Sequence, residues 1–183
     1  MNYYFEICAL PDFELNQQTI MDLLFAKLSR ALKEVGGHIG VSFPYARKTL
    51  GDTLRIHGQS EELHDLQELR WLEGLRNYTR VTEIQPVPKN TRYRCVRRIQ
   101  VKSNVGRLYR RSIKKGWITE EEAQESIRIS KEQRANLPHL RLKNWYSGQI
   151  FLLFIEQGPI VDKPTPGFFS CYGLSESATV PWF

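Results

Sequence analysis

The chain has 183 residues and carries 26 basic against 20 acidic side chains, which gives a formal net charge of +6. With 41% hydrophobic and 11% aromatic residues it can bury a substantial core, which excludes a disordered chain. The longest apolar run, Ile150 to Ile155, is far shorter than the roughly 20 residues of a membrane-spanning helix. The sequence does not begin with a signal-peptide pattern. Its three cysteines fit neither a zinc pattern nor a disulfide framework, so we expect reduced thiols and a cytoplasmic location.

The first half of the sequence predicts the order strand, helix, strand, strand, helix, strand. Residues 2–10 favour a strand, and Asn16 can cap a helix that runs to Val35, where a glycine pair ends it. This helix has an apolar stripe at three- and four-residue steps, formed by Ile20, Leu23, Leu24, Leu28, Ala31, Leu32 and Val35. Further elements are expected at 38–43, 53–57, 61–69 and 79–87. This is the ferredoxin-like order, so we predict an α+β fold with a ferredoxin-like domain over residues 1–88.

The second half, residues 89–183, is predicted to form another domain with a basic helix and carboxy-terminal strands. The expected elements are a strand at 92–102, a helix at 104–115, a second helix from 119 toward 137 and a strand at 149–156. Asn104 can cap the first of these helices, and Thr119 with Glu122 resembles a capping box at the start of the second. The tail from Gly167 is rich in turn residues.

The positive charge is concentrated in one segment. Between Ile84 and Thr119 there is no Asp or Glu, whereas eleven basic residues occur there, which leaves 15 basic and 20 acidic residues elsewhere. The eleven are Lys89, Arg92, Arg94, Arg97, Arg98, Lys102, Arg107, Arg110, Arg111, Lys114 and Lys115. Such concentration is typical of a site for a polyanion, most often a nucleic acid. The alternative is a solvated charged face, although such faces normally mix both signs.

The predicted basic helix carries its charge on one face. Arg107, Arg110, Arg111, Lys114 and Lys115 follow steps of three and one, and at about 1.5 Å per residue they span roughly 12 Å. A cationic row of this length matches successive phosphates of a duplex. Binding of a protein to such a duplex depends steeply on salt concentration, because each neutralised phosphate releases counterions.

Two residues of the preceding strand have the chemistry of base readers. Arg98 and Gln100 would lie on the same face, and arginine can bind guanine while glutamine can bind adenine through paired hydrogen bonds. The alternative is that both side chains only cap or solvate a strand edge.

Four segments match a known family: Leu23–Leu32, Ile39–Pro44, Gln100–Asn104 and Ser170–Ser175, the last ahead of a final Pro-Trp-Phe. With these motifs the chain resembles the repeat-specific endoribonuclease of type I-F CRISPR systems, which cuts precursor CRISPR RNA at the foot of a repeat hairpin. The resemblance covers essentially the whole chain. It implies a ferredoxin-like amino-terminal domain and a carboxy-terminal RNA-binding part.

The resemblance implies that the basic helix lies in the major groove of the RNA stem. An open end of a short stem would relieve the usual narrowness of that groove. The implied RNA contacts are Arg98, Gln100, Lys102, Asn104, Arg107, Arg110, Arg111, Lys114, Lys115 and Phe151. Phe151 would stack on a base near the cut, and the alternative is a core position in a strand. The implied partners are the repeat stem-loop RNA and other subunits of a type I-F surveillance complex. The resemblance implies no membrane contact and a monomer when free.

The family cuts RNA without metal or cofactor, by attack of a ribose 2′-OH on the adjacent phosphorus. Tyr172 matches the family's site tyrosine, with a buried structural tyrosine as the alternative. The family's catalytic histidine falls on Ser29, which cannot act as a base near neutral pH. The family's serine falls on Asn144, with Ser147 nearby. We therefore predict tight binding and slow cutting.

Two questions stay open from the sequence. Another histidine could replace the missing one: His38 would be about 13 Å away along a helix, whereas His139 precedes the segment with Asn144. The alternative function is a structured-RNA binding module without catalysis.

Overall fold

Two antiparallel sheets pack around a shared core in the computed structural model, which describes residues 1–100, 105–144 and 147–183. Within the helices, the side chains of 105–108 and 130–136 lie outside this description. The elements of the first half are β1 (Tyr3–Ala9), α1 (Gln17–Val35), β2 (Gly40–Ser42), β3 (Thr53–Gly58), α2 (Ser60–Glu68), η1 (Arg76–Tyr78), β4 (Thr79–Val81) and β5 (Gln85–Pro86). Those of the second half are β6 (Arg92–Ile99), α3 (Val105–Lys114), α4 (Glu120–Asn136), β7 (His139–Lys143), β8 (Ile150–Val161) and β9 (Thr179–Trp182).

The first sheet confirms the ferredoxin-like prediction. Its strand order is β2-β3-β1-β4, all antiparallel, and β5 also pairs with β1. The single strand predicted at 79–87 is instead divided into β4 and β5. At the break, the hydroxyl of Thr82 accepts a hydrogen bond from the backbone N–H of Glu6, in place of a backbone carbonyl. Because a side-chain hydroxyl replaces a backbone carbonyl as the acceptor here, the regular backbone pairing between the strands is interrupted.

Helix α1 is the main covering element of the fold. Asn16 caps it as predicted, by accepting a hydrogen bond from the backbone N–H of Thr19 at 2.9 Å. The predicted buried stripe is wrong at Leu23, which is 42% exposed, whereas Met21 and Phe25 are buried. The buried arc is wider on the Phe25 side because α1 also packs against β7 of the second sheet.

A polar contact fixes α1 against β7. One carboxylate oxygen of Asp22 accepts hydrogen bonds from Gln18 and from the backbone N–H of Arg141. Gln18 also donates to the carbonyl of His139. Burial raises the pKa of Asp22, and the two hydrogen bonds oppose that rise. This contact sets the position of the end of β7 relative to α1.

The second sheet has the order β7-β8-β6-β9, so residues from four separate parts of the second half meet in it. Strands β7 and β9 lie outside the residue ranges predicted for strands, and β8 extends beyond its predicted range to Val161. A five-residue strand and a strand that contains Pro181 give little periodic signal. The boundary at residue 88 falls between β5 and β6, while the core contains residues of both sheets. The division into two domains therefore stays a prediction.

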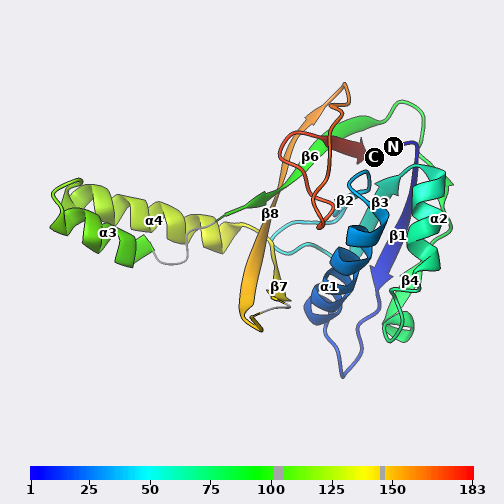
Figure 1. Ribbon diagram of the computed structural model, residues 1–183, viewed down its shortest axis with the longest axis horizontal. Coiled ribbons are helices and arrows are strands. Elements are labelled where there is room, and N and C mark those ends of the chain that lie inside the picture. Colours follow the sequence, from blue (N-terminus) through cyan, green and yellow to red (C-terminus); the bar gives the residue numbers. More distant parts are fainter. Residues whose placement is uncertain (101–104, 145–146) are drawn as a thin grey trace.

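Helices α3 and α4 form a hairpin that projects away from both sheets (Figure 1). This confirms the two predicted helices. The capping box is also confirmed, because Thr119 and Glu122 exchange hydrogen bonds between side chain and backbone at 3.2 and 2.9 Å. Among the described residues, no helix has both the length and the apolar character needed to cross a membrane.

The loop after β8 is held between the two sheets by backbone hydrogen bonds. Val41 donates to the carbonyl of Gly173 at 2.9 Å, and Ser175 donates to the carbonyl of Val96 at 3.0 Å. Gly173 has a φ of +67°, and a Cβ atom there would lie 2.7 Å from Cγ1 of Val41. Only glycine allows this approach, which places the neighbouring Tyr172 against α1.

We expect Gly173→Ala to destabilise the protein. Crowding against Val41 costs about 1–3 kcal/mol, and the left-handed backbone adds roughly 1–2 kcal/mol for a residue with a Cβ. Urea unfolding measures the loss. Gly74→Ala is the matched control, since Gly74 has a φ of +79° and open space around a Cβ. The crowding argument fails if the two variants lose equal free energy of unfolding.

Candidate functional site

A small hollow of about 140 Å³ lies where α1, the β7–β8 hairpin and the loop with Tyr172 meet. Its lining consists of Ala26, Ser29, Arg30, Lys33, Leu142, Lys143, Asn144, Phe151 and Tyr172. Four of the predicted site residues are thus brought together from three separate segments: Ser29, Asn144, Phe151 and Tyr172. Among the described lining residues, three side chains are cationic and none is acidic.

Ser29 lies on the face of α1 that borders the hollow. Its hydroxyl donates to the carbonyl of Ala26, three residues earlier, at 2.9 Å. This back-bond is a common arrangement of serine inside a helix. The side chain is half-buried and brings no group that titrates near neutral pH to the hollow.

Asn144 and Ser147 belong to the turn that joins β7 to β8. The side-chain oxygen of Asn144 accepts a hydrogen bond from the backbone N–H of Ser147 at 3.1 Å. The Ser147 hydroxyl accepts from the backbone N–H of Gln149 at 3.4 Å. Asn144 lines the hollow, whereas Ser147, in the same turn, is not part of the lining. The catalytic roles of both stay predictions.

Aromatic side chains close the other side of the hollow. The ring of Tyr172 stacks on Phe25, with ring centres 6.2 Å apart and planes 6° apart. Burial raises the pKa of the Tyr172 phenol, the nearby Cys171 adds to the rise, and Arg98 opposes it. The hydroxyl therefore keeps its proton at neutral pH and can donate a hydrogen bond. Phe151 is half-buried and pairs with Leu142 in the β7–β8 register, so it both packs on the core and borders the hollow.

None of the four histidines lines the hollow. His38 packs against Phe168 and borders a different cavity of about 460 Å³. His139 packs against Phe154, at the end of β7 that is remote from Asn144. The ring of His57 is fully buried beside the Ser42 hydroxyl at 2.8 Å, and burial and Arg55 lower its pKa. His64 bonds to the carbonyl of Ser60 within α2. The structure therefore gives no support to His38 or His139 as a replacement base.

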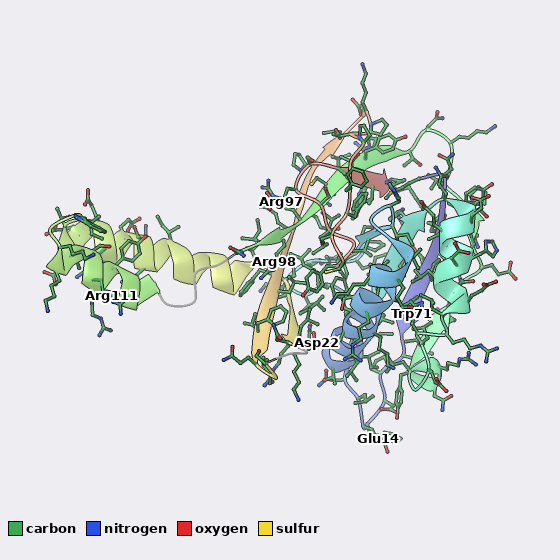
Figure 2. The ribbon with its side chains drawn as sticks, viewed as in Figure 1. Glu14, Asp22, Trp71, Arg97, Arg98 and Arg111 are labelled. Atoms are coloured by element: carbon green, nitrogen blue, oxygen red, sulfur yellow. The ribbon has the colours of Figure 1, made fainter. Side chains whose placement is uncertain are left out.

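The exposed face of the α3–α4 hairpin carries the predicted cationic row. Arg110, Arg111, Lys114 and Lys115 are all exposed, and no ion pair with an acidic side chain is found for them in the part of the chain that is described. Figure 2 shows Arg111 on the projecting hairpin, well away from the body of the protein. Arg107 lies within α3, but its side chain is outside the described part of the chain. Lys102 and Asn104 lie outside the described residues entirely.

The arginines of β6 differ in their partners. Arg94 donates to the carbonyls of Gln157 and Gly158 and lies over the ring of Trp182, so it is structural. Arg97 pairs with Glu156 on β8. Arg98 is exposed and has no hydrogen-bond partner among the described residues. It lies on β6 between the projecting hairpin and the body (Figure 2), close enough to Tyr172 to affect its pKa. Gln100 is exposed and follows the end of β6.

Sequence reasoning missed three cations of the hollow and one aromatic residue. The cations are Arg30 and Lys33 of α1 and Lys143 of β7. Arg30 and Lys33 looked like ordinary exposed residues of a helix. Lys143 gave no signal because β7 was not predicted. Trp117 is 71% exposed after α3, and the ammonium of Lys115 lies 4.5 Å from the centre of its ring. Gly116 predicted the turn at the end of α3, but nothing in the sequence predicted the contact between Lys115 and Trp117.

Comparison with known proteins identifies the class. The family described as "CRISPR-associated protein (Cas_Csy4)" matches residues 4–183. The chain therefore belongs to this family, which confirms the resemblance inferred from its motifs.

Two relatives named "CRISPR-associated endonuclease Cas6/Csy4" match over their full length and that of this chain. One, from Escherichia coli (strain UTI89 / UPEC), is 47% identical over 184 residues, and the other, from Pseudomonas aeruginosa (strain UCBPP-PA14), is 42% identical over 187. A solved structure titled as the CRISPR RNA processing endoribonuclease Cas6b aligns with 98% of this chain and 100% of its own. At 11% identity and a TM-score of 0.31, this alignment is too distant to add to the argument.

Proposed function

We propose that this chain binds the stem-loop of CRISPR repeat RNA and processes precursor CRISPR RNA at the base of the stem. The bound stem lies along the basic face of α3, and its lower end reaches Arg98 and the hollow. The chain then stays on its product, the mature guide. Membership of the Cas_Csy4 family and the names of the two full-length relatives support this function.

One observation carries the proposal: the described part of the chain combines exposed cations on α3, for which no ion pair is found, with an exposed Arg98 that lies close enough to Tyr172 to affect its pKa. Tyr172 in turn lines the hollow together with Ser29 and Asn144. A duplex on α3 gains its affinity from phosphate contacts. Base recognition falls to Arg98 and Gln100, whose side chains suit guanine and adenine.

The reaction within the hollow is attack of a ribose 2′-OH on the next phosphorus, which leaves a 2′,3′-cyclic phosphate and a 5′-OH. It proceeds slowly in this chain, because Ser29 cannot accept the proton and no histidine lines the hollow. The Tyr172 hydroxyl donates a hydrogen bond, and Asn144 orients the nucleophile. Metal independence belongs to this proposal as well.

The same observation favours a second candidate, a structured-RNA binding module that does not cut. In either case the chain acts as a cytoplasmic monomer when free and joins other subunits of a type I-F surveillance complex once it holds the guide RNA.

A competition experiment tests the proposed function. The labelled probe is the repeat stem-loop of the CRISPR array from the source genome, and the competitors are its DNA version, an RNA with the stem unpaired and a scrambled RNA. We expect only the paired RNA to displace the probe efficiently, with affinity that falls steeply with salt. Equal competition by the unpaired RNA would refute the proposal.

A further inference from the structure

We propose that Lys33 and Lys143 form a binding site for the scissile phosphate in the hollow, an inference that rests on the proposed function. The two side chains come from separate elements, α1 and the end of β7, and both line the same space as Ser29 and Tyr172. Neither position belongs to the motifs by which the sequence was assigned. The site would take the phosphodiester before the cut and the terminal cyclic phosphate after it.

The position of Lys33 follows from the helix. It lies four residues after Ser29, so both side chains project from the same face of α1, one turn apart. Ala26 completes this face on the other side of Ser29. Any group that approaches Ser29 from the hollow therefore also approaches the ammonium of Lys33.

The position of Lys143 follows from the β7–β8 hairpin. It pairs with Ile150 in the register, directly before the turn that begins at Asn144. Gly148 of this turn has a φ of +68°, and a Cβ atom there would lie 3.7 Å from Cε of Lys143. The aliphatic part of Lys143 thus runs along the turn, and Lys143 lines the hollow from the β7–β8 hairpin, whereas Lys33 lines it from α1.

The charge balance of the hollow indicates an anionic ligand. Lys33 and Lys143 line a space of only about 140 Å³, and none of the described residues that line it is acidic. No ion pair is found for either lysine among the described side chains. Cations gathered in this way repel one another, and a phosphate relieves that repulsion while it accepts their hydrogen bonds.

A phosphate site at this place also has a chemical consequence. During the cut, a bond forms between the 2′ oxygen and phosphorus while the bond from phosphorus to the 5′ oxygen breaks. The 2′-OH proton passes to water or hydroxide, and the 5′ oxygen takes a proton from water. Negative charge grows on the non-bridging oxygens in between, where fixed ammonium groups stabilise the transition state.

The test compares two product hairpins that differ only in their 3′ end, one with a 2′,3′-cyclic phosphate and one with a free diol. We expect the parent chain to bind the phosphate-bearing hairpin about tenfold more tightly. Lys33→Gln and Lys143→Gln should each remove most of this preference, whereas Lys33→Arg and Lys143→Arg should retain it. Lys163→Gln, an exposed charge in the loop after β8, is the matched control and should keep the full preference.

The outcomes separate this inference from the proposed function. If the parent does not distinguish the two ends, or if the glutamine variants keep the preference, the phosphate site is refuted. If neither hairpin binds better than an unpaired RNA, the proposed function itself fails. In a Ser29→His background, the same glutamine changes should lower the single-turnover cleavage rate about tenfold or more at saturating protein. Unchanged rates there would overturn the role in the transition state.

Discussion

The substitution Ser29→His should raise the single-turnover rate of stem-loop cleavage by about 10²–10⁴-fold, the usual range for general acid–base catalysis. Position 29 borders the hollow, within one helical turn of Ala26 and Lys33. An imidazole there can accept the proton of the 2′-OH, which the Ser29 hydroxyl cannot do. The measurement uses excess protein and a labelled repeat stem-loop, so that the rate reports the chemical step rather than product release.

The pH profile of the Ser29→His variant should identify the new base. The imidazole must be neutral to accept a proton, so the rate should rise with pH and then level off. Neighbouring cations lower the pKa of this imidazole and the bound phosphate raises it, so the rate should level off at a pH close to the ordinary histidine pKa of about 6.5. Ser29→Asn is the control, because it keeps polarity without titration and should stay slow. If the unmodified chain already cuts as fast as the histidine variant, Ser29 does not limit catalysis.

Neutralising the basic face of α3 should weaken stem-loop binding by about 10³-fold at physiological salt, since four phosphate contacts are lost. The variant combines Arg110→Gln, Arg111→Gln, Lys114→Gln and Lys115→Gln. Glutamine has a helix propensity similar to that of lysine and arginine, so α3 is retained. The plot of log affinity against log salt should also become flatter, by about 0.9 for each contact removed.

The matched control removes the same total charge elsewhere. Arg47→Gln, Lys48→Gln, Arg76→Gln and Lys163→Gln lie at exposed positions outside the α3–α4 hairpin. We expect this variant to retain most of the affinity and most of the salt dependence. Equal losses in the two variants would mean that net charge, rather than the row on α3, determines binding.

Local sequence signals predicted most of the fold. The cap at Asn16, the capping box at Thr119 and the order of the first six elements each depend on neighbouring residues, and the structure confirms them. Leu23 shows where such reasoning fails. The contact of α1 with β7, which is distant in sequence and was not predicted, widens the buried arc on the Phe25 side, while Leu23 stays exposed.

The candidate site shows the same limit. Ser29, Asn144 and Tyr172 were found only through the family resemblance, because three separate segments meet there and no spacing within the chain relates them. Lys33 and Lys143 were missed, since an exposed lysine on a helix or at a strand end is ordinary until the fold places both beside the same hollow. The basic face of α3 could be predicted, because its residues follow one helical period.

Cross-linking tests most directly whether the base of a folded RNA stem lies in this hollow. A repeat stem-loop would carry 4-thiouridine at the stem base and a 2′-deoxy sugar that blocks the cut. After irradiation, we expect cross-links to peptides that contain Phe151 or Tyr172, and none when the stem is unpaired. Cross-links that map instead to the cavity lined by His38 and Tyr93 would contradict the account.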